Sequence, residues 1–207
     1  MIAALTKYFP ELSATQSTQF ENLVTHFKSW NEKINLVSRK DMDGFLEHHV
    51  LHSLAIYKAM KFASGSRILD VGTGGGLPGL PLAILMPDVN FVLCDSRGKK
   101  IKVVNELVKA LDLKNVEPMH ARAEDIEGTF DFIVSRAVSR LDKFIPWVEG
   151  KIDNRAINAW PNGILYLKGG DLREELEEIN HPTETLHISQ WFAEEYFETK
   201  SVVYVTL

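Results

Sequence analysis

Apolar residues recur with the spacing of one helical face in the stretch that follows Ser13. They are Phe20, Leu23, Val24, Phe27, Trp30 and Ile34. Ser13 and Gln16 predict where this helix begins, because a serine and a glutamine three residues later can each bond the other's backbone amide. A similar apolar stripe predicts a second helix over residues 42–60. We expect both helices to form an N-terminal appendage, residues 1–63, before a larger domain.

The pattern changes after Ser64-Gly65-Ser66, where short apolar runs begin to alternate with amphipathic stretches. The runs predict strands at residues 67–71, 90–94, 116–120, 130–135, 163–168, 186–192 and 201–206. The amphipathic stretches predict helices at residues 77–86, 98–111, 141–151 and 172–179. This alternation favours an α/β fold, in which residues 64–207 form a doubly wound, mostly parallel seven-stranded sheet. No helical stretch separates the last two strands, so we expect them to pair antiparallel.

A glycine-rich turn joins the first predicted strand to the helix after it. Residues 70–76 are Asp-Val-Gly-Thr-Gly-Gly-Gly, and glycines let the backbone turn sharply and approach a ligand closely. Asp70, followed by glycines at every second position, resembles the first motif of S-adenosylmethionine-dependent methyltransferases. Gly74, Gly76 and Gly79 also fit a dinucleotide fingerprint. Against a dinucleotide, Pro78 offers no N–H to a pyrophosphate, which the Asp70 carboxylate would also repel. A tight turn without any ligand remains a third interpretation.

Polar residues also end the next three predicted strands, and parallel strands meet their ligands at the carboxyl edge of the sheet. Asp95 follows the second strand, where a carboxylate can accept both hydroxyls of an adenosyl ribose. Ala123 and Glu124 follow the third strand, where an adenine ring would lie. Arg136 follows the fourth. Each alone fits a solvated strand end, but their convergence on one edge favours a cofactor site.

The chain shows no dedicated nucleophile for methyl transfer. Residues 135–138, Ser-Arg-Ala-Val, stand where enzymes that methylate exocyclic amines often carry an Asn/Asp-Pro-Pro-aromatic tetrapeptide. Methylation of pyrimidine carbon 5 needs a cysteine, and the one cysteine, Cys94, lies in an apolar run typical of a core. A nitrogen with a free lone pair, such as guanine N7, needs neither nucleophile nor base, so positioning and desolvation suffice.

Composition and charge narrow the class of protein. No run of about 18 apolar residues predicts a membrane span, and the N-terminus does not resemble a secretory signal. A single cysteine excludes an internal disulfide and a cysteine-rich zinc site, and it fits a reducing cytoplasm. His48 and His52 are one helical turn apart without an evident third ligand, so we expect no metal. Among these histidines, His49 is the candidate for a functional place near the active cleft, although a satisfied core histidine is the more common case.

The net charge of −5 argues against a nucleic-acid partner, but the charge is unevenly distributed. Residues 171–200 contain nine acidic and two basic side chains, whereas residues 95–122 contain seven basic and four acidic ones. A local basic surface is therefore compatible with the acidic total. A single lysine there fits a solvated helix face equally well.

Residues 70–83, Asp-Val-Gly-Thr-Gly-Gly-Gly-Leu-Pro-Gly-Leu-Pro-Leu-Ala, resemble the signature of the bacterial 16S ribosomal RNA guanine-N7 methyltransferases, the glucose-inhibited division protein B family. Further matches cover roughly residues 25–170: Trp30-Asn31, Asn35-Leu36, His49, Ser53, Asp95-Ser96, Gly98-Lys99-Lys100, Arg122-Ala123-Glu124, Ser135-Arg136-Ala137 and Leu167-Lys168-Gly169. The resemblance implies a Rossmann-like class I methyltransferase that methylates guanine 527 of 16S ribosomal RNA, with the free RNA or the 30S subunit as partner. We expect a monomer.

The resemblance also implies roles for single residues. Gly72 and Leu77, with Asp70 and Gly74 of the same turn, would line the methionine and sulfonium part of the donor. The ribose would be held by Asp95, the adenine by Ala123 and Glu124. Arg136 would face the transferable methyl, and its planar guanidinium could hold the guanine or a phosphate. Four cations are candidate RNA contacts by charge and place alone: Arg39, Lys99, Lys100 and Lys168.

The chain departs from the family pattern at three places. His52 stands where the family often has an aspartate, Gly75 replaces a frequent proline, and the residues from Asp171 onward match little. Two other functions therefore stay open: a methyltransferase of a small molecule or protein, and a non-catalytic RNA-binding assembly factor that keeps a donor pocket.

Overall fold

The computed structural model describes residues 2–38 and 41–207, and one predicted RNA contact, Arg39, lies outside this part of the chain. Seven strands form one sheet in the order β3-β2-β1-β4-β5-β7-β6. Their bounds are β1 Arg67–Val71, β2 Asn90–Asp95, β3 Val116–His120, β4 Phe132–Arg136, β5 Gly163–Gly169, β6 Thr183–His187 and β7 Lys200–Thr206. The strand order reverses between β1 and β4, and in such sheets this switch point opens the crevice that receives ligands.

The sheet divides into a parallel part and an antiparallel edge. The strands from β3 through β5 pair in parallel, and β7 pairs antiparallel with both β5 and β6. The predicted doubly wound, mostly parallel sheet with an antiparallel final pair is thus confirmed. Its central strands are buried on both faces, which explains their continuous apolar runs.

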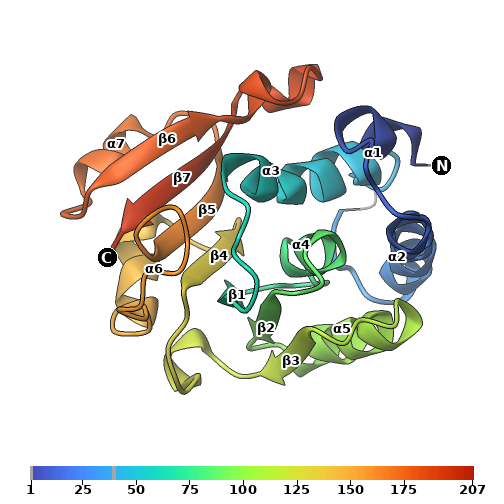
Figure 1. Ribbon diagram of the computed structural model, residues 1–207, viewed down its shortest axis with the longest axis horizontal. Helices are drawn as coiled ribbons and strands as arrows, with labels where there is room; N and C mark the ends of the chain where they lie inside the picture. Colours follow the sequence, from blue (N-terminus) through green and yellow to red (C-terminus); the bar gives the residue numbers. More distant parts are fainter. Residues whose placement is uncertain (1, 39–40) are drawn as a thin grey trace.

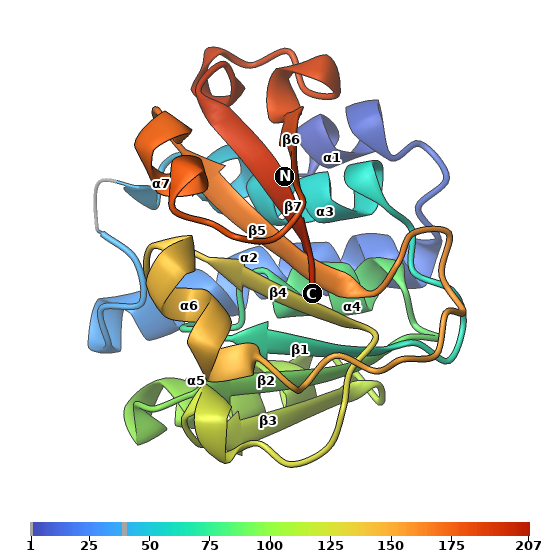
Figure 2. The ribbon, with the colours of Figure 1, turned by 90° about the vertical axis from the view of Figure 1, so that its left-hand side faces the viewer.

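Helices cover both faces of the sheet (Figure 1). One face carries α1 Ala3–Tyr8, α2 Ala14–Lys33, the π-helix η2 Phe45–Leu51, α3 His52–Ala59, α4 Gly79–Leu85 and α5 Gly98–Ala110. The other face carries α6 Leu141–Val148, α7 Arg173–Glu177 and the short 3₁₀ helix η3 Ala123–Asp125, and Figure 2 looks onto it. None of the helices in the described residues is long and apolar enough to cross a membrane.

Helix α2 packs the N-terminal region onto the sheet domain. The predicted capping box is present, since the Ser13 side chain accepts from the Gln16 amide and the Gln16 side chain accepts from the Ser13 amide. On the buried side, Phe20 and Phe27 of α2 lie in the same apolar cluster as residues of α4 and α5. Gln16 also donates to the Ile84 carbonyl at the end of α4. The predicted appendage therefore shares one core with the sheet.

Three predicted elements differ most clearly from the structure. The stretch predicted as a helix over residues 42–60 is a π-helix that continues as α3. The helix after the glycine turn begins at Gly79 because residues up to Leu77 still form the turn. The strand predicted at residues 186–192 is wrong: β6 ends at His187, and a 3₁₀ turn lets Ile188 and Phe192 both point into the core. Apolar spacing in that stretch reflects a turn over the core, not strand alternation.

Candidate active site

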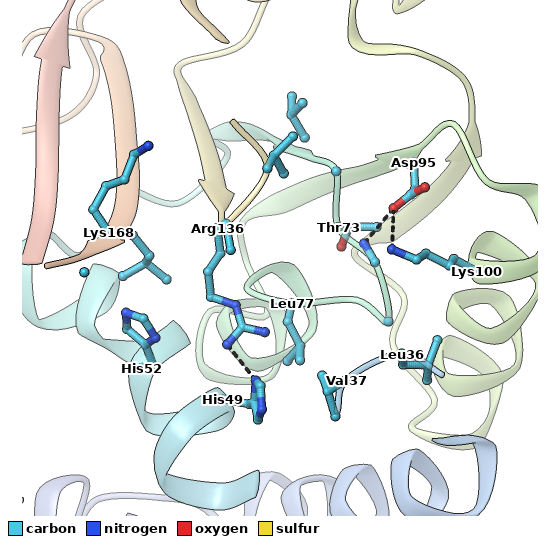
Figure 3. A pocket seen from close by; sticks show the side chains of 18 of the residues that line it. Leu36, Val37, His49, His52, Thr73, Leu77, Asp95, Lys100, Arg136 and Lys168 are labelled. Atoms are coloured by element: carbon cyan, nitrogen blue, oxygen red, sulfur yellow. Dashed lines mark hydrogen bonds and ion pairs between the residues drawn. The ribbon is translucent and has the colours of Figure 1, made fainter. Parts of the chain in front are cut away.

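An open cavity of about 1180 Å³ lies at the carboxyl ends of the parallel strands (Figure 3). The residues of the sequence prediction that line it are Gly72, Gly74, Leu77, Asp95, Lys100, Ala123, Glu124, Arg136 and Lys168. Pockets for drug-sized ligands measure about 300–1,000 Å³, so this cavity has room for an adenosyl cofactor and part of a second ligand. Two predicted residues, Asp70 and Lys99, do not line it.

The glycine turn presents its backbone to the cavity. Gly72 adopts a φ of +68°, in the left-handed region that side chains rarely adopt, and an added Cβ would collide with Val138. Thr73 anchors the turn, since its amide donates to the Cys94 carbonyl at 3.0 Å and its carbonyl accepts from Leu77 at 2.8 Å. The turn is therefore rigid, and it brings β1 and α4 close to the ligand space.

Asp70 supports the turn from beneath and does not line the cavity. Its Oδ2 accepts from the Thr73 hydroxyl at 2.6 Å and from the Gly79 amide at 2.8 Å. The carboxyl is fully buried, and this burial raises its pKa to about 7. The predicted contact between Asp70 and the donor is thus replaced by contacts that hold the loop, because the strand end points this side chain inward.

Asp95 joins the turn to the next strand while facing the cavity. Its two oxygens accept from the Gly74 amide at 3.0 Å and from the Arg97 amide at 2.8 Å. Lys100 places its ammonium 3.6 Å from the same carboxylate, so this predicted RNA contact lies on the cavity wall, paired with an acid (Figure 3). Each carboxylate oxygen can accept more than one bond, so Asp95 keeps capacity for a ligand hydroxyl.

Arg136 reaches across the cavity from β4 to the π-helix (Figure 3). Its Nη1 donates to His49 Nδ1 at 2.8 Å and to the His48 carbonyl at 3.3 Å. A guanidinium only donates, so Nδ1 of His49 must accept, and this imidazole is neutral. Burial and the nearby positive charge of Arg136 lower the pKa of His49 to about 3. The pair therefore carries one positive charge, on Arg136, throughout the physiological range.

Several cavity residues come from parts of the chain that the sequence reasoning did not connect with a site. Val37 lies after α2 and Tyr196 in the acidic C-terminal segment. The Tyr196 ring stacks on His48 with centroids 4.1 Å apart, and its hydroxyl donates to the His48 carbonyl. Neither position carries a local motif. The one feature of the sequence that could have drawn attention to them is that each is an apolar or aromatic residue among polar neighbours.

The remaining predicted RNA contacts have different surroundings. Lys168 lines the cavity, but its ammonium lies 2.7 Å from Glu175 Oε1 and donates to the Ser139 carbonyl at 2.7 Å. Its side chain is only 10% exposed, so its charge is neutralised inside the protein. Lys99 is exposed on α5. Arg97 and Arg122, which the prediction did not include, are exposed at the rim of the cavity.

Comparison with known proteins supplies the family. The model of the GidB family, described as rRNA small subunit methyltransferase G, matches residues 16–202. The chain belongs to this family. It is 53% identical over 199 residues to ribosomal RNA small subunit methyltransferase G of Cytophaga hutchinsonii, covering 96% of each chain. It is also 53% identical to the protein of the same name from Flavobacterium psychrophilum, covering 97% of this chain and 96% of the other.

Membership in the rRNA small subunit methyltransferase G family confirms the predicted resemblance. A crystal structure of an S-adenosylmethionine-dependent methyltransferase from Aquifex aeolicus shares the fold, with a TM-score of 0.57 and 18% identity over 79% of this chain and 93% of the other. The Rossmann-like methyltransferase fold and the cofactor, S-adenosylmethionine, are likewise confirmed. The described residues contain no group of three or more histidine, cysteine, aspartate or glutamate side chains that could hold a metal ion.

Proposed function

We propose that this protein methylates N7 of guanine 527 in 16S ribosomal RNA, presented by the 30S subunit or by a precursor of it, and that it acts as a monomer in the cytoplasm. The supporting observation is the cavity at the switch point, where the glycine turn and Asp95 form one wall and the Arg136–His49 pair forms another. Family membership supports the RNA substrate.

The donor would occupy the wall built by β1 and β2. S-adenosylmethionine supplies an electrophilic methyl group carried on a sulfonium. Gly72, Gly74 and Leu77 would contact its methionine end, and Asp95 would accept the ribose hydroxyls. Ala123 and Glu124, from η3, would border the adenine. The residues fit this group because the backbone of the turn is accessible and Asp95 retains free lone pairs.

The acceptor side would rely on positioning. Cys94 is buried in β2 and its burial raises the pKa of the thiol to about 12, so it does not serve as a thiolate nucleophile. Guanine N7 carries its own lone pair and needs no base. Arg136, held by His49, is charged and faces the cavity, where it would hold the guanine or its phosphate by parallel N–H bonds. This arrangement would orient the acceptor next to the donor wall.

The RNA backbone would meet exposed cations at one rim of the cavity. Arg97 and Lys99 lie at the start of α5, and Arg122 follows β3. Contacts with phosphates supply affinity that falls as salt rises, which these exposed side chains can provide despite the net charge of −5. Lys100 lies between this rim and the donor wall.

The test is methyl transfer from radiolabelled S-adenosylmethionine to 30S subunits from cells that lack their own copy of this enzyme, followed by mapping of the label. We expect label at N7 of guanine 527. Donor binding without label in subunits or deproteinised RNA would overturn the RNA substrate. Label on a metabolite or protein would then support the small-molecule or protein alternative. Binding to the subunit without methylation of RNA, metabolite or protein would support the non-catalytic assembly factor.

A further inference from the structure

The loop between β4 and α6, residues 137–140, closes the cavity next to the donor wall. Ala137 adopts a φ of +53°, a conformation that costs a non-glycine residue energy. The next residue, Val138, lies directly over Gly72, where an added Cβ would collide with it. Val138 is still 38% exposed, so its other side faces the open space. The loop therefore touches the donor turn and the acceptor space together.

Tyr166 of β5 holds this loop from beneath. Its hydroxyl accepts from the Val138 amide at 3.2 Å and from the Ser139 amide at 3.0 Å. The same hydroxyl donates to the Ser139 carbonyl at 3.0 Å. The tyrosine is fully buried. Three contacts with one fixed hydroxyl restrict the loop to one conformation, which offsets the cost at Ala137.

A largely buried ion pair completes the support. Lys168 donates to the Ser139 carbonyl, and its ammonium lies 2.7 Å from Glu175 Oε1. The same Glu175 oxygen accepts from the Leu141 amide at 2.6 Å, which caps the start of α6. The side chains of Lys168 and Glu175 are only 10% and 12% exposed. Glu175 thus tethers the C-terminal half of the loop, directly at Leu141 and through Lys168 at Ser139, although it comes from α7 in the acidic C-terminal segment.

We propose that Glu175 is a positioning residue for methyl transfer: with Lys168 it holds loop 137–140 against Gly72, so that Arg136 and Val138 meet the acceptor in one arrangement. The proposal rests on the function proposed above and gives the acidic segment a role in it. It also assigns Lys168 to this support instead of RNA contact, because both of its short contacts lie within the protein.

The two possible roles of Lys168 predict different effects of Glu175→Ala on subunit affinity and on the transfer rate. If Lys168 contacted RNA, losing Glu175 would free its charge and tighten subunit binding. If it supports the loop, Glu175→Ala slows transfer and leaves subunit affinity unchanged. We expect the single-turnover rate at saturating donor and subunit to fall about 10- to 100-fold, the loss typical of a misplaced reacting group. The donor Kd should change less than about threefold, because the contacts of Asp95 and Thr73 do not involve this loop.

Two variants separate positioning from folding. Glu175→Gln keeps an oxygen that accepts from Leu141 and Lys168, so it should restore the rate to within about fivefold of the wild type. Glu177→Ala is the matched control, because Glu177 lies on the same helix, α7, and is exposed. It should leave the rate unchanged. The double variant Lys168→Met, Glu175→Leu leaves no buried charge and should be as slow as Glu175→Ala, even where its stability is restored.

Amide hydrogen exchange provides a readout independent of RNA. Glu175→Ala should increase the amide exchange rates of Val138, Ser139 and Leu141, and this increase should be at least about tenfold larger than the increase at Thr73. If wild-type enzyme labels no RNA, the proposed function fails, and this exchange pattern still decides whether Glu175 holds the loop. Unchanged exchange, an unchanged transfer rate below the melting temperature, or tighter subunit binding would each overturn the proposal.

Discussion

The two walls of the cavity are built in different ways. On the donor wall, hydrogen bonds join residues close in sequence: Asp70 to Thr73 across 3 positions and Asp95 to Gly74 across 21. On the acceptor wall, Arg136 meets His49 across 87 positions and Tyr196 meets the His48 carbonyl across 148. The donor wall is thus a property of one βαβ segment, and the acceptor wall exists only when the whole chain has folded.

The chemistry of the contacts differs as well. Carboxylates that accept from backbone N–H groups and from the Thr73 hydroxyl hold the donor wall, so its geometry depends on two aspartates and a glycine turn. On the acceptor wall, arginine and tyrosine side chains donate instead, to the neutral His49 ring and to the His48 carbonyl. We infer that substitutions in the first wall change donor affinity and those in the second change the rate at saturation.

The largest expected effect tests the donor wall. Asp95→Ala removes the acceptor of two backbone N–H groups and of the proposed ribose contact. Hydrogen bonds to charged groups contribute about 1.5–3 kcal/mol each, so the donor Kd should rise at least about 100-fold. Calorimetric titration with S-adenosylmethionine measures this. Asp112→Ala, which removes an exposed acid paired with Lys114, is the control and should bind the donor normally.

The next effect tests the acceptor wall. Arg136→Lys keeps a positive charge but cannot make parallel N–H bonds, so we expect about a 100-fold lower transfer rate at saturation. The donor Kd should stay within about threefold of the wild-type value. Rapid-quench single-turnover assays and calorimetry separate the two quantities. An Arg136→Lys enzyme that transfers normally but binds the donor poorly would break the division between the walls.

The division also explains what could be predicted from the sequence. The strand–turn–helix pattern and the spacing to Asp95 are local, so the donor wall and the α/β fold followed from the residues. The carboxyl of Asp70 was misplaced because a motif gives the position of a residue and not the direction of its side chain. Tyr196 and Glu175 were missed because their partners are distant in sequence. The Lys168 prediction rested on charge and place, which cannot reveal an acid beside it from another part of the chain.

A smaller effect concerns how the free energy of unfolding depends on pH. A buried group in each wall changes this free energy with pH, and the two changes have opposite signs. Asp70 has a folded pKa near 7, above the usual 3.8, so its ionisation lowers the free energy of unfolding as pH rises from about 4 to 7. His49 has a folded pKa near 3, below the usual 6.5, so it lowers the free energy of unfolding as pH falls below about 6.5. The two slopes oppose each other in the wild type between about pH 4 and 6.5.

Removing one group should therefore shift the balance toward the other, and the buried His52 adds to the His49 side because burial lowers its pKa as well. Asp70→Asn should give a free energy of unfolding that rises more steeply with pH than in the wild type. His49→Gln, which still offers an oxygen to Arg136, should give one that rises less or falls. Urea denaturation at several pH values measures both, with Asp112→Asn as an exposed control. Parallel profiles for all variants would show that neither buried group shifts its pKa on folding.

The smallest effect joins the two walls through the N-terminal helices. An added Cβ at Gly75 would lie 2.6 Å from the Phe27 ring of α2, so helix α2 constrains the donor turn. Gly75→Ala should weaken donor binding about three- to tenfold because the ring or the turn must shift. Phe27→Leu frees space, so the double variant should bind more tightly than Gly75→Ala alone. A double-mutant cycle on donor Kd measures this coupling. Additive effects would mean that the turn yields without moving α2, and that the donor wall is as local in its energetics as it is in sequence.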